Sequence, residues 1–265
     1  MELATKQELP ALTALWHVCF GDSPGLIAGF WKQMFSHIRV YAARERDSVA
    51  AMVCALPTTL VDESGESFEC SYLYAVCTHP HHRGRGLCTR LLAYAEQQEA
   101  TRGAVFAALV PESPEKFGFY EKRGYQTACY HARHEVKAGG KAKITAVQAE
   151  AYDALRQMQL YGSFLSYEQP FLAYQEAVAQ VSGGGLFRIE TADTVCCAAA
   201  ECNGSRLVIK ELLPYDETAA AALVAHLGCS SAEVRSDGGN LPFGMLKALG
   251  NVPLPERAYL GLALD

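Results

Sequence analysis

The sequence predicts an α/β protein of two domains, each with a mixed, largely antiparallel twisted sheet flanked by helices. Two observations carry this prediction. Half of the 265 residues are hydrophobic and 20% are charged, which is enough apolar material for two packed cores. In addition, stretches with apolar residues at helical spacing alternate with stretches rich in Val, Tyr, Phe and Cys that are separated by turn-forming residues.

The first half of the chain predicts helices followed by a strand meander, a longer helix and a buried strand. In order, the expected elements are a short strand at 2–6, helices at 10–20 and 24–37, strands at 39–44, 48–59 and 67–78, a helix at 86–102, a strand at 104–110, a short helix at 115–123 and a hairpin-like pair at 125–136.

The small, basic and glycine-bearing segment 137–143 predicts an exposed linker, which gives domains at residues 1–137 and 143–265. The order of elements then partly repeats, so we expect an internal duplication. The expected elements of the second half are helices at 148–161 and 167–181, strands at 185–191, 194–202 and 207–214, a helix at 217–227 and a last strand at 258–263.

The composition of the chain argues against nucleic acids and membranes as binding partners. The net charge is −6 and no run of Lys or Arg exceeds two residues, which argues against a nucleic-acid surface. The chain start lacks a signal-peptide pattern and no apolar run approaches the ~20 residues of a membrane span, so we expect a cytoplasmic protein without membrane contact. The ten cysteines fit small buried hydrophobes in a reducing compartment better than a disulfide framework.

The most informative stretch is a predicted strand that runs through a loop with two glycines directly into a helix. Gly84 and Gly86 allow backbone conformations that a Cβ would block. The first amides of a helix are unpaired within it and lie at its positive end, where they bind anions such as pyrophosphate. Arg83 and Arg85 add positive charge, and Thr89 adds a hydroxyl. The alternative is a turn that merely requires glycine.

Other interpretations of the glycine loop and of the histidines before it fit the sequence less well. The dinucleotide fingerprint G-x-G-x-x-G has Thr89 at its third glycine position, and no P-loop string occurs. His79, His81 and His82 lack the fixed spacing and further ligands of a metal site, so we expect solvated loop residues and no metal.

Two motifs resemble the GNAT superfamily of N-acetyltransferases. Arg83-Gly-Arg-Gly-Leu-Cys88 is similar to its coenzyme A loop, [Q/R]-x-x-G-x-[G/A], and departs from it at Cys88. Phe119-Tyr-Glu-Lys-Arg-Gly-Tyr125 is similar to the F-Y-E-K-x-G-[F/Y] signature at the usual distance. The resemblance in residue detail covers about 70–136.

The resemblance implies an acetyl-CoA-dependent N-acetyltransferase with a primary amine as acceptor, which attacks the thioester directly. Amides of the loop would hold the pyrophosphate, the preceding strand would bind the pantetheine arm, and Ser113 stands where the family often has an Asn. The implied cofactor-binding residues are Val76, Cys77, Thr78, Arg83, Gly84, Arg85, Gly86, Leu87, Cys88, Thr89 and Ser113.

The resemblance also implies that Tyr120 is the general acid for the departing thiolate, since a phenol with a pKa near 10 can donate to a thiolate whose thiol has a pKa near 8.5. Its alternative role is aromatic packing. Some relatives carry the general base for the acceptor amine at the position of Cys70. Glu69, the neighbouring residue, is therefore the candidate base in this chain, and its alternative role is that of a solvated charge on a strand. An acyl-cysteine route through Cys77 or Cys88 is less favoured, because neither has a base adjacent in the sequence.

Further acidic residues either line the acceptor site or belong to a turn and a helix start. They are Glu63, Glu66, Glu112 and Glu115.

The second half lacks both motifs: Tyr-Asp-Glu-Thr-Ala follows the strand 207–214. The resemblance, which extends to relatives of the enhanced intracellular survival acetyltransferases, implies a degenerate copy that shapes the acceptor cleft. The rival function is a non-catalytic acyl-CoA-binding sensor or assembly module. Both a monomer and a homodimer remain open.

Overall fold

The computed structural model describes residues 1–46 and 48–264, and they form two compact units. The first unit comprises Met1–Leu60, Ser67–Gln126 and Met245–Leu254, and the second comprises Val61–Glu66, Thr127–Gly244 and the chain from Pro255 onward. The predicted linker at 137–143 lies inside the second unit. Among the described residues, no helix has the length and apolar character that a bilayer span requires.

The first unit begins with two helices that pack through aromatic rings. α1 (Leu9–Phe20) has Pro10 in its first turn and ends at Gly21 in a left-handed conformation, and α2 (Pro24–Met34) is capped by the Ser23 hydroxyl. The Trp16 ring lies 5.0 Å from Phe30 and 5.4 Å from Tyr74, centroid to centroid. These contacts dock α1 against α2 and a strand of the sheet.

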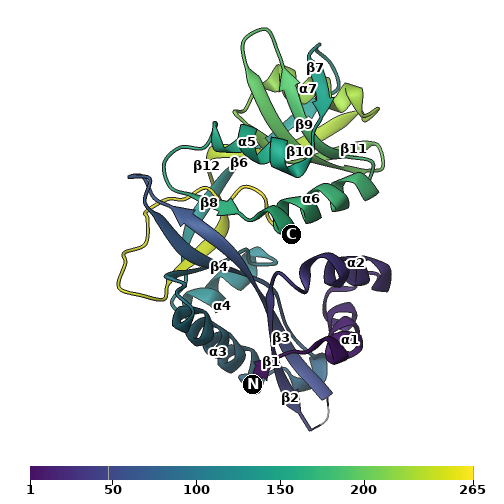
Figure 1. The fold of residues 1–265 in the computed structure, drawn as a ribbon. Coiled ribbons are helices and arrows are strands. Elements are labelled where there is room, and N and C mark those ends of the chain that lie inside the picture. The colour runs from purple at the N-terminus through teal and green to yellow at the C-terminus, as the bar shows by residue number, and fades with distance from the viewer. Residues whose placement is uncertain (47, 265) are drawn as a thin grey trace. The chain divides into compact units, whose positions relative to one another are not determined.

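The sheet of the first unit is a meander followed by a crossover. The strands β1 (Glu2–Leu3), β2 (Arg39–Glu45), β3 (Ser48–Val61) and β4 (Ser67–Thr78) are neighbours in that order. α3 (Leu87–Thr101) then leads to β5 (Phe106–Leu109), which is parallel to β4. Figure 1 shows α1 and α2 on one side of these strands and α3 with the short α4 (Phe117–Glu121) on the other.

The second unit uses the same order of pairing. Its elements are part of β6 (Gln126–Lys137), β7 (Lys143–Ala146), α5 (Ala149–Gln157), β8 (Phe164–Tyr167), α6 (Gln169–Val181), β9 (Gly185–Glu190), β10 (Val195–Asn203), β11 (Arg206–Leu213), α7 (Glu217–His226) and the start of β12 (Ser231–Ala248). β7, β9, β10 and β11 are neighbours in that order, and β12 is parallel to β11 after the α7 crossover. The sequence β1-β2-β3-β4-α3-β5 of the first unit therefore has a topological counterpart in β7-β9-β10-β11-α7-β12.

Two predicted elements were wrong, and the strands β7, β8 and β12 were missed. The hairpin expected at 125–136 is the single strand β6. The strand expected at 258–263 is absent among the described residues, where only isolated bridges occur at Ala258 and Tyr259. β12 was missed because Gly238, Gly239 and Pro242 read as a turn. Gly239 lies inside the strand because β6 approaches closely: a Cβ there would be 2.1 Å from the His131 carbonyl oxygen.

Candidate active site

The loop between β4 and α3 leaves a helix N-terminus uncapped. Gly84 and Gly86 have φ angles of 76° and 69°, a left-handed conformation that a residue with a Cβ adopts at a cost. Gly86 is the N-cap of α3, and as a glycine it has no side chain that could accept a hydrogen bond from the first amides of the helix. The residues from Arg83 to Gly86 are exposed. These amides are therefore available to an external anion.

Two arginines hold the loop in shape. Arg83 Nε donates to the Thr78 carbonyl oxygen at 3.0 Å, so its side chain folds back onto the end of β4. Arg90, one turn into α3, donates to the Arg85 carbonyl oxygen at 2.9 Å. A Cβ on Gly86 would lie 3.4 Å from that Arg90 side chain. Side chains that could obstruct the helix start are thus turned toward the loop backbone.

The two sequence motifs meet at Thr89. Arg123 Nε donates to Thr89 Oγ1 at 3.1 Å, although 34 residues separate them. The same guanidinium donates to the Phe119 carbonyl oxygen and lies 3.4 Å from the centroid of the Phe119 ring. The F-Y-E-K segment is in this way attached to the first turn of α3.

β4 separates from β5 beside the loop. Their register runs from Cys70–Phe106 to Tyr72–Ala108, and in the described part of the chain no pairing to β5 follows it. Three residues later Ala75 has a φ of 50°, which is uncommon for a residue with a side chain and tends to mark functional sites. The edge of β4 beyond Tyr72 can therefore accept an extended ligand as an added strand. The sequence offers no sign of Ala75, because an alanine in an apolar run looks like ordinary strand.

Tyr120 is buried on α4, with 9% of its surface exposed, among the core residues that include Leu87 and Leu91. Its ring centroid lies 5.7 Å from that of Tyr125. Burial raises the pKa of Tyr120 well above its usual value, and the charge of Glu112 raises it further. The phenol is therefore protonated at neutral pH and can act as a donor.

The other predicted ligand-binding residues divide between backbone and side-chain roles. Leu87 packs in the core, and Val76 packs against it, so each offers only its backbone to a ligand. Burial raises the pKa of the Cys88 thiol, which keeps it protonated. Ser113 is the N-cap of a short 3₁₀ turn, and its hydroxyl is engaged by the Glu115 carboxylate.

The structure does not bring Glu69 to the loop. Its carbonyl oxygen accepts from Val105 N at 2.7 Å, and its carboxylate lies beside Gly103, past the C-terminal end of α3. The loop lies at the N-terminal end of that 15-residue helix, which is about 22 Å long. Glu112, by contrast, is near enough to affect the pKa of Tyr120. Its position after β5 carried no signal that distinguished it from the other acidic residues.

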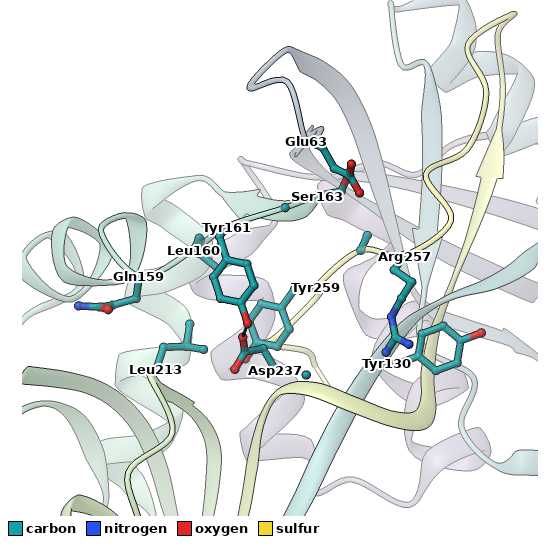
Figure 2. Close-up of a pocket in the computed structure, with 13 residues that line it drawn as sticks. Glu63, Tyr130, Gln159, Leu160, Tyr161, Ser163, Leu213, Asp237, Arg257 and Tyr259 are labelled. Carbon is teal, nitrogen blue, oxygen red and sulfur yellow. Dashed lines mark hydrogen bonds between the residues drawn. The ribbon is translucent and has the colours of Figure 1, made fainter. Parts of the chain in front are cut away.

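The second unit contains a separate cavity of about 320 Å³, drawn in Figure 2. Tyr161 donates a hydrogen bond to Asp237, and the Arg257 guanidinium lies 4.6 Å from the centroid of the Tyr130 ring. None of the predicted catalytic or cofactor-binding residues lines it. In residues 1–46 and 48–264 no group of three or more His, Cys, Asp or Glu side chains is arranged to hold a metal ion.

Comparison with known proteins identifies the first unit. Residues 1–128 match the family model of the acetyltransferase (GNAT) domain. No curated protein sequence matches the chain.

Several solved structures share the fold over nearly the whole chain. A probable N-acyltransferase from Enterococcus faecalis is 17% identical, with a TM-score of 0.73 over 94% of this chain and 72% of that one. A GCN5-related N-acetyltransferase from Anabaena variabilis is 17% identical, with a TM-score of 0.72 over 93% and 72%. Eis1 from Mycobacterium abscessus is 13% identical, with a TM-score of 0.67 over 94% and 74%. The likeness establishes a shared fold, and the family match establishes that residues 1–128 form a domain of the GNAT acetyltransferase family.

Proposed function

We propose that the first unit transfers an acetyl group from acetyl-CoA to a primary amine by direct attack, with Tyr120 as the general acid. The observation that carries this proposal is the uncapped start of α3, which stands next to a strand edge released from its neighbour and close to a buried, protonated tyrosine. An anion site, an edge for an extended arm and a proton donor are what a coenzyme A thioester requires.

The residues present fit acetyl-CoA. The amides from Leu87 to Thr89 and the exposed Arg83 and Arg85 suit the pyrophosphate, since a helix N-terminus favours negative charge. The β4 backbone from Val76 to Thr78, beyond the kink at Ala75, suits the amide groups of the pantetheine arm.

Tyr120 has the protonation state that its role requires. Acetyl-CoA supplies an activated thioester carbonyl, and the bond to sulfur breaks as the amine adds. The sulfur then gains negative charge, which the Tyr120 hydroxyl stabilises by donating a hydrogen bond or its proton. Because burial and the charge of Glu112 keep the pKa of Tyr120 high, this proton is present throughout the neutral range.

The acceptor amine must lose a proton before it attacks. An alkylamine with a pKa near 10.4 is neutral in about one molecule in 10³ at pH 7. Glu112 is better placed than Glu69 to take this proton through water, because its charge affects Tyr120. We therefore expect Glu112→Gln to lower kcat/KM on the acidic side of the pH profile, whereas the matched control Glu69→Gln leaves the profile unchanged. The reverse result would assign the base to Glu69.

The decisive experiment measures binding and turnover on the same sample. Titration calorimetry with acetyl-CoA should give a stoichiometry of one per chain, and a panel of amines monitored with a thiol-detecting reagent should release coenzyme A. Absence of binding would overturn the proposal.

Binding without turnover on any amine would instead support a non-catalytic acyl-CoA-binding module. One observation favours this second candidate: the predicted base Glu69 lies at the far end of α3 from the loop.

We further propose that the second unit is a degenerate copy of the first. The shared order of strand pairing supports this, as does the start of α7, where the Asp216 carboxylate accepts from Ala219 N at 2.7 Å. A helix N-terminus already occupied by its own carboxylate offers no site to a pyrophosphate. A stoichiometry of two acetyl-CoA per chain would contradict this assignment.

A further inference from the structure

Two cysteines from distant parts of the first unit meet where α1 ends beside β4. Trp16 of α1 packs on Tyr74 of β4 with their ring centroids 5.4 Å apart. Cys19 lies three residues after Trp16, and Cys77 lies three residues after Tyr74. The docking of α1 on β4 therefore places Cys19 at the end of β4 that carries Cys77.

Three polar groups converge on this point. The Cys19 thiol donates to the Thr78 carbonyl oxygen at 3.5 Å, and Arg83 Nε donates to the same oxygen at 3.0 Å. Cys77 directly precedes Thr78 in the chain, and the two thiols shift one another's pKa. Cys19 is partly exposed, whereas Cys77 is buried. A small reagent can thus reach Cys19 directly, whereas Cys77 is shielded from it.

The surroundings of the two thiols shift their pKa values in opposite directions. The hydrogen bond from Cys77 and the positive charge of Arg83 lower the pKa of Cys19 to about 7, against burial and the charge of Glu112. The contact with Cys19, together with burial, raises the pKa of Cys77. Cys19 is therefore partly thiolate at neutral pH, and thiolates are the species that peroxides oxidise.

We propose that Cys19 and Cys77 are a peroxide-oxidised thiol pair that closes to a disulfide between α1 and β4. The Cys19 thiolate attacks hydrogen peroxide, becomes a sulfenic acid and releases hydroxide. The Cys77 sulfur then attacks the sulfenic sulfur, its proton leaves with the hydroxyl as water, and the disulfide forms. One peroxide takes up two electrons, and the pair loses two hydrogens.

The second unit provides an internal control. Cys202 and Cys229 also form a pair in which one thiol shifts the pKa of the other. Burial and Cys229 raise the pKa of Cys202, and no positively charged side chain contributes to its shift. The second pair therefore lacks both influences that lower the pKa of Cys19, so we expect it to react more slowly with peroxide.

The test treats the reduced full-length protein with hydrogen peroxide and maps the products by differential alkylation and mass spectrometry. We expect a Cys19–Cys77 disulfide, 2 Da lighter than the thiol pair, to form at least tenfold faster than any Cys202–Cys229 product, with a rate that rises through pH 7. Cys19→Ser should abolish it and Cys202→Ser should not, while thermal unfolding confirms that both variants fold. Oxidation of both pairs at the same rate, or pairing of Cys19 with another cysteine, would overturn the proposal.

Oxidation also bears on the proposed acetyl-CoA site, and this consequence rests on the proposed function. Cys77 and Arg83 belong both to the environment of the thiol pair and to the proposed acetyl-CoA site. The disulfide should therefore weaken acetyl-CoA binding at least tenfold, and dithiothreitol should restore the binding. Bound acetyl-CoA should in turn protect Cys19 from alkylation. If the disulfide forms but the reduced protein binds no acetyl-CoA, the proposed function fails and the thiol pair stands. If the reduced protein binds acetyl-CoA and the disulfide does not form, the thiol pair fails alone.

Discussion

The two units share an order of strands but start their crossover helices in opposite ways. In the first unit α3 follows Gly86, which has no side chain to offer the helix amides. In the second unit α7 follows Asp216, whose carboxylate accepts from the third amide of the helix. One helix start is open to an anion, and the other already holds one.

Topology by itself therefore does not make an anion site. A helix N-terminus attracts negative charge in either unit. Whether that attraction serves a ligand or the fold depends on the residue at the cap. A carboxylate there contributes about 1 kcal/mol to stability, whereas a glycine leaves the amides for a partner from solution.

The two units also differ in how deeply their arginine–glutamate ion pairs are buried. In the second unit Arg156 and Glu211 are both fully buried, with Arg156 Nε donating to Glu211 at 2.8 Å. In the first unit Arg39 donates to the buried Glu99 at 2.6 Å, but 31% of the Arg39 side chain is exposed. If Arg39 loses its carboxylate partner, water can still solvate its charge. If Arg156 loses its partner, its buried charge has no access to water.

The largest effect we predict therefore falls on stability in the second unit. Glu211→Gln should lower the free energy of unfolding by about 3–5 kcal/mol, because it leaves the Arg156 charge buried without its counter-ion. The matched Glu99→Gln should cost about 1–3 kcal/mol. Urea titration followed by circular dichroism measures both, and equal costs would contradict the contrast in burial.

Tyr120→Phe tests whether the first unit carries the chemistry. Loss of the buried proton donor should lower turnover by roughly 10²–10³ while acetyl-CoA affinity stays the same. Tyr125→Phe is the matched control in the same aromatic cluster, since its hydroxyl donates to Glu96 at 2.8 Å rather than toward a substrate. It should reduce stability but change turnover only a few-fold. Unchanged turnover in Tyr120→Phe would remove the tyrosine from the mechanism.

Gly86→Asp would convert the open helix start into one that resembles the second unit. Its carboxylate should cap α3 and repel a diphosphate, lowering acetyl-CoA affinity by about 100-fold in calorimetry. Gly86→Asn is the neutral counterpart, and Asn tolerates the left-handed conformation as Asp does. Gly86→Asn should lower acetyl-CoA affinity by only about tenfold. Equal losses of affinity in the two variants would show that charge at the cap is unimportant.

Asp216→Ala makes the reverse change and has the smallest expected effect. Removing the cap should lower the free energy of unfolding by about 1 kcal/mol, and Asp216→Asn should retain most of that stability. Neither variant should raise the acetyl-CoA stoichiometry above one, because α7 lacks the neighbouring arginines. A second bound molecule would mean that the cap alone suppresses a site in the second unit.

Sequence patterns predicted the fold best where short-range rules apply. The helix starts near Pro10 and Pro24, the strand meander and the crossover helix all follow from local periodicity and capping. β12 escaped these rules because it contains two adjacent glycines and a proline, and the close approach of β6 explains only Gly239. The strand predicted at 258–263 failed for the opposite reason: its apolar residues are buried without a continuous partner strand among the described residues.

By itself the sequence determined the glycine loop, the tyrosine segment and their family, because each motif is a run of neighbours whose chemistry is local. Which distant groups meet depends on the three-dimensional packing of the chain. This packing placed Arg123 on Thr89, set Glu69 at the far end of α3, turned Ala75 out of the strand conformation and brought Cys19 to Cys77. These outcomes depend on how helices dock on the sheet, and docking is governed by packing between residues that no local pattern connects.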